Sequence, residues 1–202
     1  MEPLTRVEGY AAALPEDDLD TDVIYPARFL LLMNKTGLGR YAFHDRRFTA
    51  QGAEDPVFVL NRAPWREATI LVAGRNFGCG SSREQAVWTL RDFGIRCVIA
   101  AGFGEIFFAN CQHNGVLAIR LPAADLQTVT RAAAANKTFT VDLRSQVIHM
   151  EASDTVKFDV EPARRDALLN GWDATESILE REGGAIAAFE ARHRRTHPWM
   201  FP

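Results

Sequence analysis

Cysteine is scarce in this chain of 202 residues, which contains only Cys79, Cys97 and Cys111. The number is odd, the spacing is wide and no two cysteines form a C-x-x-C pair, which excludes the disulfide framework of a small secreted domain. The same spacing argues against an iron–sulfur cluster held by this chain alone. Reduced thiols are typical of the cytoplasm, where we expect this protein to work.

Long apolar runs and an excess of positive charge are also missing. No run of about 18 apolar residues occurs, which predicts that no segment crosses a membrane. Residues 1–14 lack a basic flank followed by an apolar core, so we predict no secretory signal. A formal net charge of −3 offers no basic footprint for nucleic acid, and we expect none as a partner.

The composition that remains is that of an ordinary globular protein, with 47% hydrophobic and 24% charged residues. The length is sufficient for one domain with a sizeable core. No internal repeat, low-complexity tract or interdomain linker interrupts the chain. We therefore predict a single domain over residues 1–202.

The most informative stretch predicts a strand, a glycine loop and a helix in succession. An apolar run at 69–73 predicts a buried strand, and apolar residues at helical spacing from 86 to 93 predict a helix. Between them lie Gly74, Gly78 and Gly80, followed by Ser81, Ser82, Arg83 and Glu84. Glycines let a ligand approach the backbone, and N–H groups at a helix N-terminus favour an anion. Arg83 adds a guanidinium suited to a carboxylate or phosphate.

A simpler interpretation of this loop is a helix cap. Ser81 and Glu84 fit the capping box S-x-x-E, and capping is the more common role of a serine at such a position. Three glycines and an arginine are more than a cap requires. The loop is not a Walker A motif, because no lysine follows its last glycine, and it lacks the dinucleotide-binding pattern G-x-G-x-x-G.

The rest of the chain alternates strand and helix patterns, which predicts an α/β fold with parallel pairing around the glycine loop. The predicted strands are a first one within 4–14, then 69–73, 97–100 and 116–119, and a hairpin formed by 138–143 and 146–150. The predicted helices are a short one from Pro26 to Met33, then 86–93, 105–113, 122–135, 164–170, 175–181 and 185–194, the last two separated by Gly183 and Gly184.

The segment Gly78-Cys79-Gly80-Ser81-Ser82-Arg83-Glu84 resembles the GxGSSRE signature of the swivel domain in the aconitase superfamily. Further matches extend over nearly the whole chain: Asp20-Thr21-Asp22 with Pro26, Phe58–Asn61, Asp92–Arg96, Glu105–Phe107, Asn110-Cys111, Asn114-Gly115, Leu168–Asp173 and His197–Trp199. Together these segments are similar to the small subunits of 3-isopropylmalate dehydratases.

The resemblance implies a three-layer β/β/α swivel domain with a partly parallel sheet and a helical C-terminal tail from about residue 163. It implies a hydro-lyase of leucine biosynthesis that isomerises 2-isopropylmalate to 3-isopropylmalate by dehydration and rehydration. By the same resemblance, Ser81 is the base and acts as an alkoxide, while Gly80, Ser82 and Arg83 bind the substrate. Such an alkoxide needs loop N–H groups and a nearby cation to stabilise it.

The resemblance also implies a partner chain. In relatives, a [4Fe–4S] cluster held by three cysteines of the large subunit acts as Lewis acid on the leaving hydroxyl. This chain has no such cysteine set, so we expect no metal bound by it alone. We expect a heterodimer, or a larger assembly, with an iron–sulfur large subunit, and a small dicarboxylate as substrate.

The segment after the first strand resembles the loop that reads the substrate's variable side chain. Within the run Leu30–Met33, Leu31 and Leu32 are the candidates to contact an isopropyl group, whose burial would gain about 2 kcal/mol. The alternative is that at least two of the leucines Leu30, Leu31 and Leu32 belong to the core. We expect the loop over 32–47 to be mobile without the partner, because its glycines and charges offer little to bury.

Two departures from the family pattern keep other functions open. Gln85 stands where the family usually has His, and Arg75 stands where it often has Asp. One alternative is a paralogue that acts on another alkylmalate, such as citramalate or dimethylmalate. A second is a module that binds small anions without catalysis. A third makes Cys79 a nucleophile beside Arg83, although no histidine close in sequence would activate it.

Overall fold

The computed structural model describes residues 1–151 and 154–201, and within them seven strands form one mixed sheet in the order β4-β3-β2-β1-β5-β6-β7. The strands are β1 (Arg6–Leu14), β2 (Ile70–Ala73), β3 (Cys97–Ala100), β4 (Leu117–Arg120), β5 (Thr138–Asp142), β6 (Val147–Met150) and β7 (Thr155–Lys157). Strands β1 to β4 pair in parallel, and β1, β5, β6 and β7 pair antiparallel. The partly parallel sheet and the hairpin are thus confirmed, whereas β7 was not predicted.

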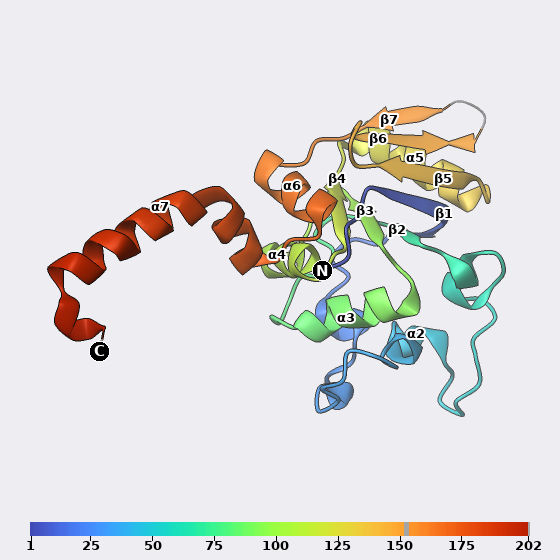
Figure 1. Cartoon of the computed structure of the whole chain (residues 1–202). Coiled ribbons are helices and arrows are strands. Elements are labelled where there is room, and N and C mark those ends of the chain that lie inside the picture. The colour runs from blue at the N-terminus through green and yellow to red at the C-terminus, as the bar shows by residue number, and fades with distance from the viewer. Residues whose placement is uncertain (152–153, 202) are drawn as a thin grey trace.

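The helices connect and cover this sheet (Figure 1). They are α1 (Thr21–Ile24), α2 (His44–Arg47), α3 (Glu84–Phe93), α4 (Glu105–His113), α5 (Ala123–Ala134), α6 (Pro162–Asn170) and α7 (Ala174–Thr196). Short 3-10 turns lie at Ala27–Phe29, Gly39–Tyr41, Val59–Asn61, Trp65–Glu67 and Pro198–Met200. Among the described residues, no helix combines the length and the apolar character needed to cross a membrane.

Both faces of the parallel strands are buried, which explains their continuous apolar sequences. In β2, Leu71 and Ala73 face one hydrophobic cluster, which α3 and α4 cover. Ile70 and Val72 alternate to the opposite face and join a second cluster, covered by α5, α6 and strands β5 to β7. The sheet therefore has a separate hydrophobic cluster on each face, one under α3 and α4 and the other under α5 and α6.

The prediction of a short helix from Pro26 to Met33 is wrong. Only Ala27–Phe29 forms a 3-10 turn. The Phe29 carbonyl accepts hydrogen bonds from the Tyr25 hydroxyl at 2.7 Å and from the Leu32 amide at 2.9 Å. These bonds close a tight turn where an α-helix would continue.

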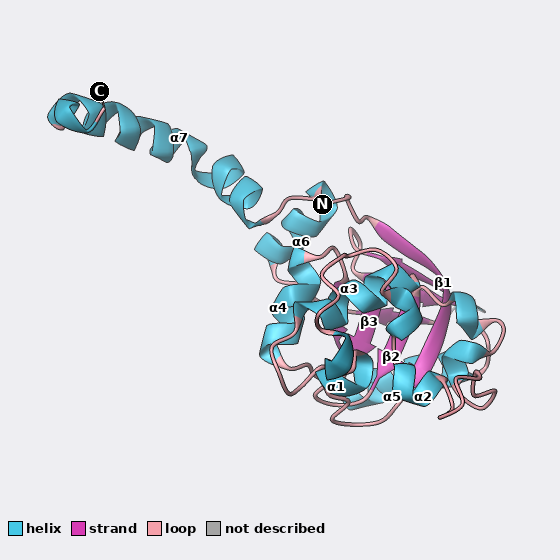
Figure 2. Ribbon diagram, turned by 90° about the horizontal axis from the view of Figure 1, so that it is seen from below, coloured by secondary structure: helices cyan, strands magenta, loops and turns pink. Residues whose placement is uncertain are grey.

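The helix break predicted at Gly183 and Gly184 is also wrong, because α7 runs unbroken from Ala174 to Thr196. A glycine inside a helix costs about 1 kcal/mol relative to alanine, which weakens the helix but does not end it. The Asp173 and Glu176 side chains form a capping box that fixes the start of α7. Figures 1 and 2 show α7 projecting from the body of the molecule.

The apolar run Leu30–Met33 does not lie in the core, so the alternative that at least two of its three leucines are core is wrong. Leu31 is 92% exposed and Leu32 and Met33 are also exposed, whereas Leu30 packs partly buried against the cluster under α3 and α4. Exposure leaves the two candidate leucines free to contact something other than this chain.

The premise that the loop over 32–47 has little to bury is wrong for its second half. Leu38, Ala42 and Phe43 are buried in the cluster under α3 and α4. The buried Arg47 guanidinium donates to the Asn61 side chain at 3.0 Å and to the Gly39 carbonyl at 3.3 Å. These contacts tie residues 38–47 to the body, while residues 31–37 remain exposed.

We predict that mobility in the uncomplexed chain is confined to residues 31–37. Hydrogen–deuterium exchange measured by mass spectrometry should find peptides from 31–37 exchanged within seconds and peptides from 38–47 protected at least about 100-fold, since buried contacts must open before those amides exchange. Fast exchange over the whole of 32–47 would contradict this division and restore the wider mobile loop.

Candidate active site

The loops that follow β1 and β2 lie side by side at the carboxyl edge of the parallel strands, where ligands of α/β proteins commonly bind. The Gly78 amide donates to the Leu19 carbonyl at 2.7 Å, and the Thr21 amide donates to the Cys79 carbonyl at 2.9 Å. The predicted glycine loop and the acidic loop at 17–22 therefore form one structure. This adjacency places the acidic loop beside the candidate site.

Arg75 has a structural role in joining these loops. Its amide donates to the Asp17 carboxylate at 2.6 Å, and its guanidinium lies 3.3 Å from the same carboxylate and 3.6 Å from Asp18. The hydrogen bond from the Arg75 amide lowers the pKa of Asp17 below its ordinary value. Both side chains are largely exposed, so this contact adds little to stability.

A third loop, after β3, contacts the glycine loop through two backbone hydrogen bonds. The Phe77 amide donates to the Gly102 carbonyl and the Gly104 amide to the Phe77 carbonyl, both at 2.9 Å. A Cβ atom on Gly78 would overlap the Phe107 ring, and one on Gly104 would lie 2.6 Å from the Gly78 carbonyl oxygen. Gly78 also has a φ of +72°, which side chains rarely adopt. The glycines are therefore required by the close approach of the loops.

Ser81 does not cap α3, so the capping-box interpretation is wrong. The residue at the N-cap position is Arg83, with no capping hydrogen bond from its side chain. The Glu84 carboxylate, which a capping box would turn back toward the loop, accepts a hydrogen bond from the Asn114 side chain at 2.8 Å. Ser81 is exposed, and its carbonyl accepts from the Thr21 hydroxyl at 2.9 Å, which holds its backbone in place.

Ser81 lies at an open hollow of about 310 Å³ between the glycine loop and the start of α4. The hollow is lined by Thr21, Gly78, Cys79, Gly80, Ser81, Arg83, Gly104, Glu105, Ile106 and Phe107. It brings together three of the predicted site residues, Gly80, Ser81 and Arg83. Ser82 is exposed next to them in the chain, and Leu31 and Leu32 do not line the hollow.

Among the described residues that line this hollow, the one cation is Arg83, whose side chain is 12% exposed and forms an ion pair with Asp22. The hydrogen bond from Arg83 lowers the pKa of the Asp22 carboxyl. Asp22 also accepts from the Ala27 amide at 3.1 Å, which fixes the carboxylate in position. Sequence reasoning missed this pairing, although Asp22 lies within one of the segments that carry the family resemblance.

The electrostatics around Cys79 oppose its role as a nucleophile. Partial burial, followed by the nearby carboxylates of Asp20 and Asp18, raises the pKa of this thiol above its ordinary value. Its sulfur lies 3.5 Å from the Asp18 carbonyl oxygen. A reactive cysteine needs a stabilised thiolate, and these neighbours stabilise the protonated form.

The residues present do not fit an iron–sulfur cluster held by this chain. Burial raises the pKa of the Cys97 and Cys111 thiols far above the ordinary range, and the third cysteine, Cys79, lies in the surface loop. Within residues 1–151 and 154–201, no group of three or more His, Cys, Asp or Glu side chains is placed to hold a metal ion.

Comparisons with known proteins decide the family. Residues 1–124 match the family model of the aconitase C-terminal domain, and residues 181–202 match a model of the C-terminal domain found in 3-isopropylmalate dehydratase small subunits. The 3-isopropylmalate dehydratase small subunit of Rhodospirillum centenum is 52% identical over 201 residues and is covered to 98%, as is this chain. The chain belongs to the 3-isopropylmalate dehydratase small-subunit family.

Other members of this family agree. The small subunit of Rhodospirillum rubrum is 47% identical over 202 residues, which cover 99% of this chain and 97% of the relative. A crystal structure of 3-isopropylmalate dehydratase from Methanocaldococcus jannaschii superposes with a TM-score of 0.67 at 26% identity, over 92% of this chain and 99% of that one. The predicted aconitase-type swivel fold and the membership of a hydro-lyase family are thus confirmed.

We predict that Gly78→Ala destabilises the protein by at least about 3 kcal/mol, because the new methyl group meets the Phe107 ring on a backbone that already disfavours a side chain. Gly52→Ala is the matched control: its φ is +81° but nothing lies within 4 Å, so it should cost only about 1 kcal/mol. Urea denaturation followed by circular dichroism measures both. Equal losses would contradict the packing argument.

We also predict that Cys79 is alkylated slowly near neutral pH. Its raised pKa keeps the thiol protonated as pH rises, so the rate with iodoacetamide should reach half its maximum at a higher pH than that of a thiol with the ordinary value of 9.0. Mass spectrometry of peptides containing Cys79, with a cysteine tripeptide as the reference, measures the rate. A rate that reaches its plateau below about pH 8 would instead favour the nucleophile hypothesis.

Proposed function

We propose that this chain is the small subunit of an enzyme that isomerises 2-isopropylmalate to 3-isopropylmalate by dehydration and rehydration. It contributes Ser81 as the base and Ser82, Arg83 and the Gly80 amide as groups that bind the substrate. The observation that carries the proposal is that Ser81 is exposed, does not cap α3 and lies beside the largely buried Arg83. Both residues line a hollow that is open on its outer side within the described chain.

The geometry supports a division of roles within the loop. A guanidinium has five N–H donors in a planar fork, and the contact with Asp22 engages one nitrogen, so others remain for a substrate carboxylate. The positive charge of Arg83 also favours the deprotonated form of a nearby serine. The φ of +86° at Gly80 is accessible to glycine without strain, so the backbone there can turn toward a ligand.

In the proposed reaction, the Ser81 alkoxide removes the proton from the carbon next to one carboxylate, and the hydroxyl leaves from the neighbouring carbon. Rehydration adds the hydroxyl and the proton with their positions exchanged. Arg83 and Ser82 hold a carboxylate in each half-reaction, and between them the planar alkene turns so that the other carbon faces Ser81. The exposed Leu31 and Leu32 contact the isopropyl group once a second surface covers them.

The proposed partner is a large subunit, as implied by the names of the relatives, which are small subunits. The resemblance to the aconitase superfamily implies that this partner carries the iron–sulfur cluster. A [4Fe–4S] cluster on that partner supplies the Lewis acid for the leaving hydroxyl, a group that this chain's described residues do not fit. We place this assembly, a heterodimer or a multiple of it, in the cytoplasm, with residues 1–202 as one swivel domain.

We predict that Ser81→Ala lowers kcat for 2-isopropylmalate by about 1,000-fold or more and changes KM little, because a base acts in the transition state. The assay uses the complex with the purified iron–sulfur large subunit and follows the alkene intermediate by its ultraviolet absorbance. Ser145→Ala, in the turn between β5 and β6, is the control and should leave kcat unchanged. Unchanged kcat in Ser81→Ala would leave only an anion-binding module.

The second candidate function is the same reaction on another alkylmalate. The exposed Leu31 and Leu32 are apolar and offer no positive charge to a further carboxylate, but they do not fix the size of the alkyl group. The same assay with 2-isopropylmalate, citramalate and dimethylmalate separates the candidates by their kcat/KM values. We expect the highest value for 2-isopropylmalate.

A further inference from the structure

The C-terminal segment formed by α7, the 3-10 turn Pro198–Met200 and Phe201, called the C-terminal arm, lies apart from the hydrophobic clusters. Not one residue of α7 is buried, although the helix has 23 residues and is therefore about 34 Å long. Figures 1 and 2 show it leaving the body beside α4 and α6 and ending far from it.

The sequence of the arm is poorly suited to a helix that stays free in water. Gly183 and Gly184 lie at its middle, where each costs about 1 kcal/mol relative to alanine. Isolated helices are marginal in water even with good helix formers, and most helices gain stability by burying an apolar face. The arm therefore lacks a surface that would cover it.

The arm has an apolar face on which such a surface would bind. At about 100° per residue, Ile178, Leu179, Ile186 and Phe189 fall on one side of α7. Ile178 is 56% exposed and Phe189 is 53% exposed, values that are unusual for large apolar residues which repeat along one face. The opposite side carries Glu180, Ala187 and Ala191.

The far end of the arm gathers aromatic and positively charged side chains. The His193 ring stacks on Phe189 at 5.4 Å between centroids and meets the edge of Phe201 at 5.7 Å. Trp199 is 74% exposed beside this cluster. Exposed Trp and Phe side chains next to arginines, which here are Arg192, Arg194 and Arg195, have the composition of an interface hot spot.

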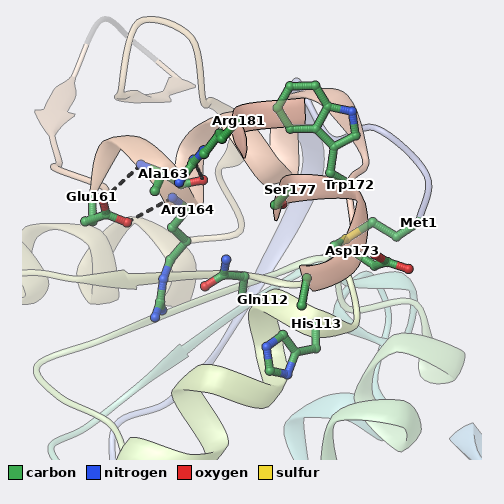
Figure 3. Close-up of a pocket in the computed structure, with 11 residues that line it drawn as sticks. Met1, Gln112, His113, Glu161, Ala163, Arg164, Trp172, Asp173, Ser177 and Arg181 are labelled. Carbon is green, nitrogen blue, oxygen red and sulfur yellow. Dashed lines mark hydrogen bonds between the residues drawn. The ribbon is translucent and has the colours of Figure 1, made fainter. Parts of the chain in front are cut away.

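The base of the arm adjoins the candidate active site through α4. A hollow of about 120 Å³ separates the end of α4 from the start of α7, with Gln112 and His113 on one side and Asp173 and Ser177 on the other (Figure 3). The Arg181 guanidinium donates to the Ala163 carbonyl at 3.1 Å and fixes α7 against α6. The start of α4 lines the hollow at Ser81 and its end lines the hollow at the arm, so α4 connects the two.

We propose that the C-terminal arm clasps the large subunit of the same enzyme, a role that rests on the proposed function. The partner presents an apolar groove for the face of Ile178, Leu179, Ile186 and Phe189, with a positively charged group in that groove for Glu182 and carboxylates for the three arginines at the far end. The arm thereby adds a second contact to the one at the open hollow, and the two contacts lie at opposite ends of α4.

A second copy of this chain fits the same face less well. The arm is acidic in its first half and basic in its second, so two antiparallel arms would match in charge. However, Glu182 lies between the two pairs of apolar residues, near the middle of the face. Antiparallel pairing about that middle would bring two Glu182 carboxylates together at the seam, where like charges oppose burial.

The family models also associate the C-terminal arm with the small subunit of this enzyme. The aconitase C-terminal domain model ends at residue 124, whereas the model specific to the C-terminal domain of 3-isopropylmalate dehydratase small subunits begins at residue 181, within α7. The segment that lies apart from the hydrophobic clusters of its own chain is thus described by a family model named for the small subunit of a larger enzyme.

The test is the affinity of the full-length chain for the purified iron–sulfur large subunit of the same organism, measured by biolayer interferometry. Phe189→Glu should raise Kd by about 30-fold or more, since a charge replaces an anchor in the groove. Ala191→Glu is the matched control, with the same new charge on the opposite side of the same helical turn, and should change Kd less than about threefold. Both variants should keep the unfolding temperature of the isolated chain, because neither position is buried in it.

Four outcomes decide the matter. A selective loss of affinity in Phe189→Glu supports the clasp, and Ser81→Ala should bind normally while being inactive. Equal affinities of Phe189→Glu and the wild type, with the wild-type complex active, would overturn the arm's role and leave the proposed function standing. An isolated chain that is dimeric by light scattering, and monomeric as Phe189→Glu, would assign the arm to a second copy instead and overturn the inference. A wild-type chain that fails to bind the large subunit at all would overturn the proposed function itself.

Discussion

The close contact of the three loops that follow β1, β2 and β3 is the constraint on which the candidate site depends. Gly78 and Gly104 allow backbone and the Phe107 ring to approach where any side chain would intervene. Once the loops are in contact, the bonds to Leu19 and Thr21 leave the glycine loop little freedom. The cost of ordering Ser81 and Arg83 is therefore met during folding, and a substrate finds them already oriented.

Much of this arrangement could be predicted from local sequence, because its determinants are local. The apolar run into β2, the glycines and the helical spacing of α3 each specify a strand, a loop or a helix within a few residues. The parallel pairing of β2 with β3 followed from the short strand–helix–strand connection between them. The motif that carries Ser81 and Arg83 is likewise contiguous, and so the family could be recognised before any fold was seen.

What could not be predicted depends on residues distant in sequence. The capping box was a sound local inference that failed because Asn114, 30 positions away, takes the Glu84 carboxylate. The pairing of Arg83 with Asp22 spans 61 positions, and neither segment alone contains a sequence pattern that predicts it. The exposure of Leu31 also depends on distant residues, since an apolar run is buried only where this chain provides a covering surface.

The open hollow and the uncovered arm are two consequences of a single requirement. A serine hydroxyl in water gains little from one guanidinium, because the solvent screens their attraction about fourfold more strongly than a site at a protein surface does. Excluding water from Ser81 requires a surface that the described residues of this chain do not supply. A second subunit that covers the hollow must be held in register, and a long helix with an apolar face and an aromatic tip is suited to hold it. The chemistry proposed for Ser81 and the binding proposed for α7 therefore depend on the same missing surface.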